Sequence, residues 1–353
     1  MGNKNVRPLP YPTLPSVLIR VTLSYAGATT ILNMQNYFPT LIKHITITDI
    51  SSTKHPRLVR TLNIRQNYKI TDSYITPFRN LRQLNCAMCS KITDLSISQL
   101  RHLISLDCTG CYKLTDASIS ILINLQYLKC SWGYKLTDAS ISRLHNLQSL
   151  NCGGCSLLTE SAILALPQLR SLSFYDCPKI TDVGLSQLHN LQTLNCSMCH
   201  HITDASIGAL RQLQSLTCDR CTQITDASIK ELHQLHTIVC QKCPRITGEG
   251  LLELHNLRTL DVSECPAVSG VFIGQLYQVR NLTCASCPLI TDASIGSLGQ
   301  LQTLNCSYNS QLTDAAIIGL SNLRVLVYYE CAKISYVGTE YLKAHHSLVR
   351  CCH

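Results

Sequence analysis

Residues 85–116 read NCAMCSKITDLSISQLRHLISLDCTGCYKLTD, and they hold two Cys-x-x-Cys pairs separated by 18 residues. A zinc ribbon has the same spacing, because two short loops bring four thiolates into a tetrahedron. Elsewhere the pairs are broken: Phe174 and Val262 replace the first cysteine, and Gly133 and Asn309 replace the second. A zinc site needs four thiolates together, so we expect these cysteines to bind no metal.

The stretch is part of a repeat with a period of 22 residues. Steps of 22 lead from Ile64 through Cys86 to Tyr328 without a slip, so thirteen units keep the pattern L-x-x-L-x-C-x-x-C-x-x-I-T-D-A-S-I-x-x-L-x-x. Such a period is the signature of a solenoid. The column of the first cysteine is otherwise apolar, which predicts a core position. The second column also accepts Asn67 and Asn309, which predicts a tight turn whose side chain bonds neighbouring backbone.

Units such as LRQLNCAMCSKITDLSISQL (81–100) and LQTLNCSMCHHITDASIGAL (191–210) resemble the leucine-rich repeat in its cysteine-containing form. The resemblance implies an α/β leucine-rich-repeat solenoid, curved, with parallel β-strands on the concave face and helices on the convex face. The unit is shorter than is usual in that family, so the helices should be short. We expect the repeats over 43–332 and a C-terminal cap over 333–353.

Thr-Asp recurs nine times between Thr71 and Asp314, just before apolar residues at helical spacing. An aspartate there can accept from orphan N–H groups and complement the helix dipole, so we expect each one to cap a helix. A calcium ladder is the alternative, but one carboxylate per turn is poor ligation. One column late in the helix holds four histidines, which we interpret as solvated helix ends and not as a metal stripe. They are His145, His189, His233 and His255.

Composition and flanking sequence narrow the class of protein. Hydrophobic residues make up 45% of the chain and charged residues 14%, which argues against disorder outside the termini, with 1–12 as a flexible tail. No apolar run is long enough for a membrane span, and the N-terminus lacks a signal peptide. The sequence therefore predicts a cytoplasmic or nuclear protein without a membrane anchor, in which the 21 cysteines stay reduced.

Positive charge is concentrated at the N-terminal end. Residues 1–70 carry nine basic side chains against Asp49 alone, a net charge of +8, which leaves +1 for the remainder. This argues against a nucleic-acid groove along the whole molecule. A recurrent arginine column leaves open a weak acidic or nucleic-acid partner, but no aromatic residues alternate with it, as a base-stacking platform requires. The column comprises Arg82, Arg170, Arg258, Arg280 and Arg324.

No catalytic constellation stands out from the repeat. Cysteine, histidine and aspartate are abundant, but their recurrence assigns them to structural columns, whereas a nucleophile beside its base would be expected at one singular place. We therefore expect neither enzyme activity nor a cofactor.

Strand alternation predicts that residues flanking the core leucine and cysteine face an open groove, where solenoids bind other proteins. Most are Ser, Thr, Asn or Gln, and the exceptions predict a protein-binding site around Trp132, the only tryptophan, which lies between Gly110 and Gly154 in its column. The alternative is that Trp132 fills a gap left by Gly133. A mixed-charge group around Asp219 and Asp261 is expected to be a solvated face. The groove candidates are Tyr127, Lys129, Trp132, Tyr175, Asp176, Arg220 and Lys242.

Residues 13–42 precede the regular units and resemble an F-box, the helical module that docks a receptor onto the adaptor of a cullin-RING ubiquitin ligase. The match rests on Leu14-Pro15, Leu18-Ile19, Leu23-Ser24-Tyr25 and Ile31-Leu32, while Val17 and Ala26 depart from the motif. It implies a substrate-recognition subunit that carries out no chemistry itself. The alternative is a free-standing binding scaffold in which this segment is only an N-terminal cap. The residues expected to contact the adaptor are Leu14, Pro15, Leu18, Leu23 and Tyr25.

Overall fold

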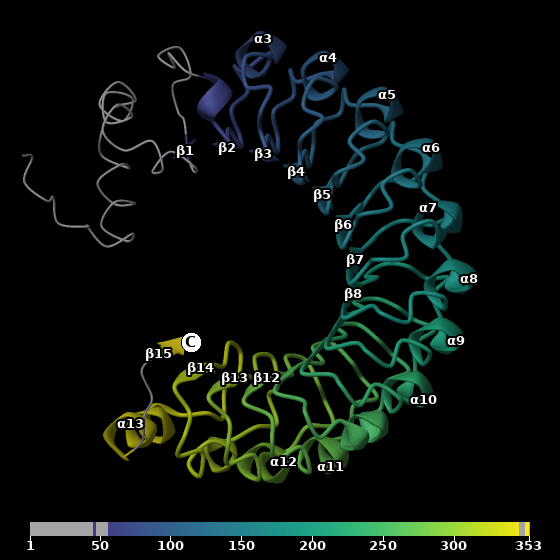
Figure 1. Cartoon of the computed structure of the whole chain (residues 1–353). Helices are drawn as coiled ribbons and strands as arrows, with labels where there is room; N and C mark the ends of the chain where they lie inside the picture. Colours follow the sequence, from purple (N-terminus) through teal and green to yellow (C-terminus); the bar gives the residue numbers. More distant parts are fainter. Residues whose placement is uncertain (1–44, 47–55, 346–349, 353) are drawn as a thin grey trace, which may run out of the picture.

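The computed structural model describes residues 45–46, 56–345 and 350–352. Their strands form one parallel sheet of 15 strands, in which neighbours follow sequence order from β1 to β15. Figure 1 shows this sheet on the inside of an open arc, with the helices on the outside. The predicted curved α/β solenoid, with parallel strands on the concave face and short helices on the convex face, is confirmed.

The elements are short throughout. The strands are β1 (Ile45–Thr46), β2 (Thr61–Asn63), β3 (Gln83–Asn85), β4 (Ser105–Asp107), β5 (Tyr127–Lys129), β6 (Ser149–Asn151), β7 (Ser171–Ser173), β8 (Thr193–Asn195), β9 (Ser215–Thr217), β10 (Thr237–Val239), β11 (Thr259–Asp261), β12 (Asn281–Thr283), β13 (Thr303–Asn305), β14 (Val325–Val327) and β15 (Arg350–Cys352). The α-helices are α3 (Asp72–Ile75), α4 (Asp94–Ile97), α5 (Asp116–Ile119), α6 (Asp138–Ile141), α7 (Glu160–Leu164), α8 (Asp182–Leu185), α9 (Asp204–Ile207), α10 (Asp226–Ile229), α11 (Gly270–Ile273), α12 (Asp292–Gly296) and α13 (Tyr336–His345). The 3₁₀ helices are η2 (Pro56–Leu58), η3 (Glu249–Glu253) and η4 (Asp314–Ala316). No helix among the described residues is long and apolar enough to cross a membrane.

The curvature follows from the different widths of the two element types. Parallel strands pack about 4.8 Å apart, whereas a helix with its side chains is about 10 Å wide. Stacked repeats therefore crowd more closely on the strand side than on the helix side, and the array bends around its strands. The four-residue helices α3–α6 limit this difference to a single helical turn per repeat.

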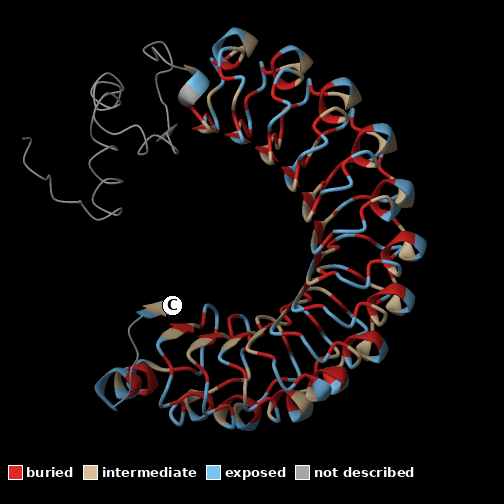
Figure 2. Cartoon of the chain, in the orientation of Figure 1, coloured by how far each residue is buried: buried red, intermediate tan, exposed pale blue. Residues whose placement is uncertain are grey.

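Each repeat contributes the same apolar positions to one continuous core. Leu84 at the middle of β3 pairs in register with Leu62 and Leu106 on the flanking strands. The first cysteine of each pair is buried, and Phe174, which replaces it in one unit, is fully buried too. Figure 2 shows that buried residues run through the whole arc between strands and helices. The predicted core role of this column is confirmed, and apolar burial is the main source of stability.

The second cysteine of each pair forms a ladder of thiol hydrogen bonds, which we call the thiol ladder. The Sγ of Cys221 donates to the carbonyl oxygen of Cys196 in the preceding repeat at 3.1 Å. Where the thiol is absent, the Nδ2 of Asn309 donates to the carbonyl oxygen of Cys284 at 2.8 Å. The prediction of a turn position that bonds neighbouring backbone is therefore confirmed. All 21 cysteines are free, and burial raises the pKa of Cys284 far above its usual value, so this thiol stays protonated.

The helices begin at a polar contact between neighbouring repeats, which we call the aspartate clamp. The carboxylate of Asp204 accepts hydrogen bonds from Thr225 N at 2.8 Å, Thr225 Oγ1 at 2.6 Å and Ser228 Oγ at 2.6 Å, all in the next repeat. The N-cap of α10 is Thr225 itself, whose Oγ1 accepts from Ala227 N. The prediction that the aspartate caps its helix is therefore wrong. Threonine is the cap, and the aspartate at the first helical position faces the following repeat.

Candidate functional site

The concave face is hollowed over β2–β6. The hollow has a volume of about 310 Å³ and is lined by successive strands. Tyr127 and Lys129 lie on β5 with the buried Leu128 between them, so both project into it as the alternation of the strand requires. Asp107 on β4 adds a carboxylate. Here the hydroxyl and amide columns of the sheet are interrupted by an aromatic ring and by charges of both signs.

Polar side chains at the ends of the strands hold the turns that follow. Asn195 Oδ1 accepts from Ser197 N at 3.0 Å, and Asp261 Oδ1 accepts from Ser263 N at 3.0 Å. The same contact recurs at Asn85 and Asn305. These groups are therefore Asx-turn residues that share their oxygens with the backbone. Sequence reasoning treated the column only as a hydrated surface, although asparagine four residues before the second cysteine position is a signal for such turns.

The predicted groove residues fall on two surfaces. Tyr127 and Lys129 are on the concave strand face, whereas Trp132, Asp176, Arg220 and Lys242 lie in the turn that follows the strand, at positive φ. All strands are parallel, so these turns gather along one edge of the sheet. This backbone column was not predicted. Its non-glycine members are Gln66, Met88, Trp132, Asp176, Met198, Arg220, Lys242, Glu264, Ser286, Tyr308 and Glu330.

Backbone hydrogen bonds hold these residues in the left-handed region, which disfavours most side chains. Trp132 N donates to Gly153 O at 2.9 Å, and Lys242 N donates to Ser263 O at 3.0 Å. The strand ladder thus continues into the turn, and each side chain in this column is carried outward at the edge of the sheet. Their regular spacing makes the edge a second continuous surface.

Four aromatic rings meet on this edge, and we call them the aromatic rim: Tyr112, Trp132, Tyr134 and Tyr175. Tyr112 and Tyr134 stack with centroids 5.9 Å apart and planes at 7°. Trp132 meets Tyr134 edge-on at 6.3 Å and Tyr175 at 6.0 Å. Tyr112 and Tyr134 are 45% and 50% exposed, so the rim presents ring surface to solvent.

Two glycines, Gly153 and Gly154, leave the space that the rings of Tyr175 and Trp132 occupy. A Cβ on Gly153 would collide with the ring of Tyr175, and one on Gly154 would lie 2.7 Å from Trp132 Cε3. A Cβ on Gly133 would meet Cys130 O and Leu136 of its own repeat. The alternative that Trp132 fills a gap left by Gly133 stays a hypothesis. Trp132 packs across the repeat boundary, on Gly154.

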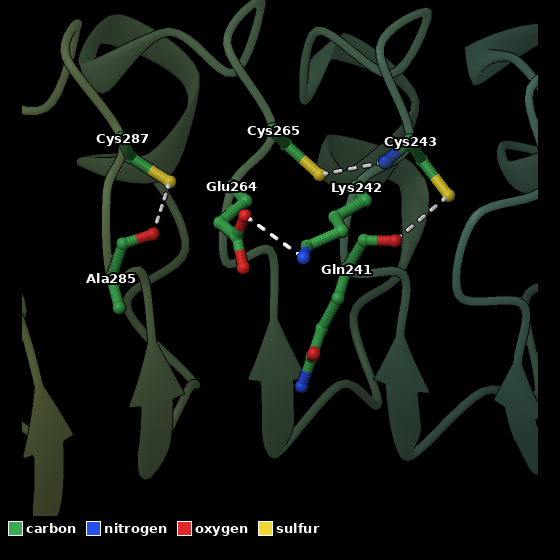
Figure 3. A network of polar contacts seen from close by, with 7 residues as sticks. All are labelled: Gln241, Lys242, Cys243, Glu264, Cys265, Ala285 and Cys287. Atoms are coloured by element: carbon green, nitrogen blue, oxygen red, sulfur yellow. Dashed lines mark hydrogen bonds and ion pairs between the residues drawn. The ribbon is translucent and has the colours of Figure 1, made fainter.

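The mixed-charge group forms internal contacts. Lys242 Nζ lies 3.1 Å from Glu264 Oε2, as Figure 3 shows beside the thiols of Cys243 and Cys265. Gln241 Nε2 donates to Asp261 Oδ2 at 2.8 Å, and Gln241 N donates to Asp219 Oδ1 at 2.9 Å. Burial raises the pKa of Asp219, with Asp261 adding to the shift. These side chains bind one another, so they offer a partner little free charge.

The remaining sequence candidates lie apart from both surfaces. The helix-end histidines are exposed, and His145 Nδ1 lies 3.1 Å from Ala165 O of the next repeat. Within the described residues no three His, Cys, Asp or Glu side chains come together as metal ligands. Of the arginine column, Arg82, Arg170, Arg280 and Arg324 are exposed. The adaptor candidates Leu14, Pro15, Leu18, Leu23 and Tyr25 lie outside the described residues.

A hydrogen bond with a cysteine of the preceding repeat lowers the pKa of four ladder thiols, which are Cys111, Cys155, Cys221 and Cys331. The hydrogen bond with Cys306 lowers the pKa of Cys331 to about 7, against the opposing effect of burial. Cys331 Sγ itself donates to Cys306 O at 3.1 Å. In the described part of the chain it has no contact with a histidine or carboxylate that could serve as a base. It therefore acts as a member of the thiol ladder.

Comparison with known proteins places the fold. No family model matches the sequence, and no curated protein matches it. Among solved structures, an internalin (InlF) from Listeria monocytogenes is similar with a TM-score of 0.61 and 21% identity, over 95% of this chain and 93% of that one. Rad7, from the yeast Rad7–Elc1 complex, gives 0.60 and 17% over 95% and 91%. A leucine-rich repeat protein of Leptospira interrogans gives 0.57 and 19% over 88% and 87%. These similarities show the leucine-rich-repeat fold.

Proposed function

We propose that the protein is a substrate-recognition receptor whose target protein binds in the concave hollow over β2–β6. The observation that carries this proposal is the interruption of the polar strand columns at Tyr127, Lys129 and Asp107. Tyrosine supplies a large contact area with few rotatable bonds, and it is enriched among residues that dominate binding energy. The strand backbone is already paired in the sheet, so recognition falls to these side chains.

In this proposal residues 13–42 dock the receptor onto the F-box adaptor of a cullin-RING ubiquitin ligase through Leu14, Pro15, Leu18, Leu23 and Tyr25. The support is the F-box-like motif and its place directly before the repeats. The receptor carries out no chemistry; it raises the effective concentration of the target near the ubiquitin carrier. Yeast Rad7, which has the same fold, was solved in a complex with Elc1, which supports assembly of such a solenoid with a second protein.

Co-expression with the F-box adaptor tests the docking step. We expect the full chain to co-purify with the adaptor and the Leu18→Asp/Leu23→Asp variant to lose it, because buried charge at a hydrophobic interface is costly. The matched control Tyr127→Ala/Lys129→Gln changes only the concave hollow and should keep the adaptor. Failure of the folded full chain to bind would leave a free-standing leucine-rich-repeat scaffold.

A further inference from the structure

A row of lysines borders the aromatic rim. Each lies two residues after the second cysteine position of its repeat, directly beside Tyr112 or Tyr134 in two of the five cases. All are exposed, and none forms an ion pair with a described residue. We call this set the lysine row. It comprises Lys69, Lys91, Lys113, Lys135 and Lys179.

The acids near this row are few or already engaged. Three aspartates each lie three residues after a lysine of the row, but their carboxylates accept hydrogen bonds from threonines of the next repeat in aspartate clamps. They are Asp94, Asp116 and Asp138. Asp176 is exposed at one end of the rim. The repeats are nearly neutral in total, but over β3–β7 exposed aromatic rings alternate with lysines that form no ion pair with a described residue.

We propose that the aromatic rim and the lysine row bind single-stranded nucleic acid, with bases stacked on the rings and phosphates beside the lysines. Every base has a π-face, so aromatic platforms in a basic setting bind single strands with little sequence preference. The rings are held in place by their contacts with one another and by Gly153 and Gly154. An acidic peptide would use the lysines but would leave the four rings without planar partners, so the surface favours nucleic acid.

This surface is separate from the concave hollow, so the inference does not depend on the proposed function. The aromatic rim and the lysine row together have the alternating aromatic and basic residues that the arginine column lacks. The footprint is also local, which reconciles it with the absence of a basic groove along the whole molecule.

The test uses the full chain and fluorescein-labelled dodecamers of oligo(dT) and oligo(U), followed by anisotropy at several salt concentrations. Trp132, the only tryptophan, is a second probe, because a base stacked on the rim should quench its emission. Duplex DNA, polyglutamate and inorganic phosphate serve as comparison ligands. We expect the single strands to bind with a Kd that rises with salt.

Three double variants separate stacking from charge. Tyr112→Ala/Tyr134→Ala should weaken binding by about tenfold or more, while Tyr112→Phe/Tyr134→Phe should retain it, because only the rings are needed. Lys113→Gln/Lys135→Gln should flatten the slope of log K against log salt by roughly 1.4, at about 0.7 per phosphate contact. The matched control Tyr277→Ala/Lys230→Gln removes an exposed ring and an exposed cation from repeats that carry no part of the aromatic rim, and it should bind as the wild type does.

The alternatives give distinct results. Absence of binding to either single strand at low salt would overturn the inference. Equal binding of polyglutamate, or tighter binding of duplex DNA, would show a general charge effect and would overturn it too. Single-strand binding that survives both the alanine and glutamine variants would place the site elsewhere, for example in the basic residues 1–70. Thermal melts of each variant establish that lost binding is not lost folding. If the alanine variant unfolds, the glutamine variant, which changes only two exposed lysines, keeps the test decisive through the salt slope.

Discussion

The repeats around α9–α10 and the two repeats that follow share one strand register but begin their helices differently. Asp204 clamps Thr225 in the next repeat, and Asp226 in turn accepts from Thr247 N. In the following two repeats the clamp position is occupied by Gly248 and Gly270. Ser269 N then donates to the backbone oxygen of Thr247. The first of these repeats has the 3₁₀ helix η3 in place of an α-helical turn.

The 22-residue period and the shape of the convex side depend on different contacts. Across the glycine-containing repeats Ile238 still pairs with Leu260, and Leu260 with Leu282. The core leucines and cysteines stay buried there as well. The strand ladder and the core therefore hold the 22-residue register without the clamp. The clamp determines how each convex turn begins and adds polar stabilisation between neighbouring repeats.

Removing a clamp should have the largest effect. Asp204→Ala leaves Thr225 N, Thr225 Oγ1 and Ser228 Oγ without their carboxylate acceptor. Hydrogen bonds to charged groups contribute about 1.5–3 kcal/mol each, and partial exposure reduces this, so we expect a loss of about 2–4 kcal/mol in the free energy of unfolding. Urea unfolding followed by circular dichroism measures it.

Glu160 is the matched control, because it occupies the clamp position but its carboxylate accepts no hydrogen bond from a described residue. Glu160→Ala should change stability by about 0.5 kcal/mol or less. If both variants lose the same unfolding free energy, the clamp adds no stability beyond local helix content. The proposed difference between clamped and unclamped repeats would then be wrong.

Building a clamp where the chain lacks one is the converse test. The triple variant Gly248→Asp, Glu249→Ala, Gly250→Ser gives this repeat the sequence Thr-Asp-Ala-Ser found in its neighbours. The new carboxylate could accept from Ser269 N and its hydroxyl, and we expect a gain of about 0.5–2 kcal/mol.

Gly250→Ser alone should instead destabilise, because a Cβ there would lie 2.6 Å from Asp226 O while the chain keeps its present path. Thermal melts of the single and triple variants give the sign of each change. A triple variant less stable than the single one would mean that the path of η3 is fixed by its surroundings and not by its own residues.

Much of the fold could be predicted from the sequence because one period imposes one geometry on every unit. The apolar column of the first cysteine and the hydrogen-bonding column of the second were both assigned correctly from the residues that replace cysteine, such as Phe174 and Asn309. The error over the aspartates has a physical reason. Spacing within one unit cannot distinguish a carboxylate that bonds its own helix from one that bonds the same position 22 residues later.

The candidate site was less predictable. Strand alternation correctly predicted that Tyr127 and Lys129 lie on the concave face, but it does not indicate at which residue a strand ends. Non-glycine residues at positive φ, such as Trp132 and Arg220, were therefore assigned to the groove instead of the edge. The stacking of Tyr112 on Tyr134 was also missed, although both precede a lysine in the same column of successive units.

The smallest effect concerns pH. Burial raises the pKa of the Asp72 carboxyl, but hydrogen bonds from Ser96 and Thr93 outweigh it, so the pKa lies below its usual value near 3.8. A carboxyl with a depressed folded-state pKa stabilises the protein above its unfolded-state pKa, and this contribution is lost as the pH falls through the folded-state value. Between about pH 5 and 3 the urea midpoint should therefore fall less in Asp72→Asn than in the wild type.

Asp219 lies outside the clamps and gives the opposite sign, because burial raises its pKa. Its folded form binds a proton more readily than its unfolded form, so protonation favours the folded state as the pH falls. Asp219→Asn should thus make the acid-side decline steeper, whereas Asp72→Asn makes it shallower. If the two variants gave parallel pH profiles, the titration of a carboxylate would not depend on whether it belongs to a clamp. The distinction between clamped and unclamped acids would then rest only on the unfolding free energies of Asp204→Ala and Glu160→Ala.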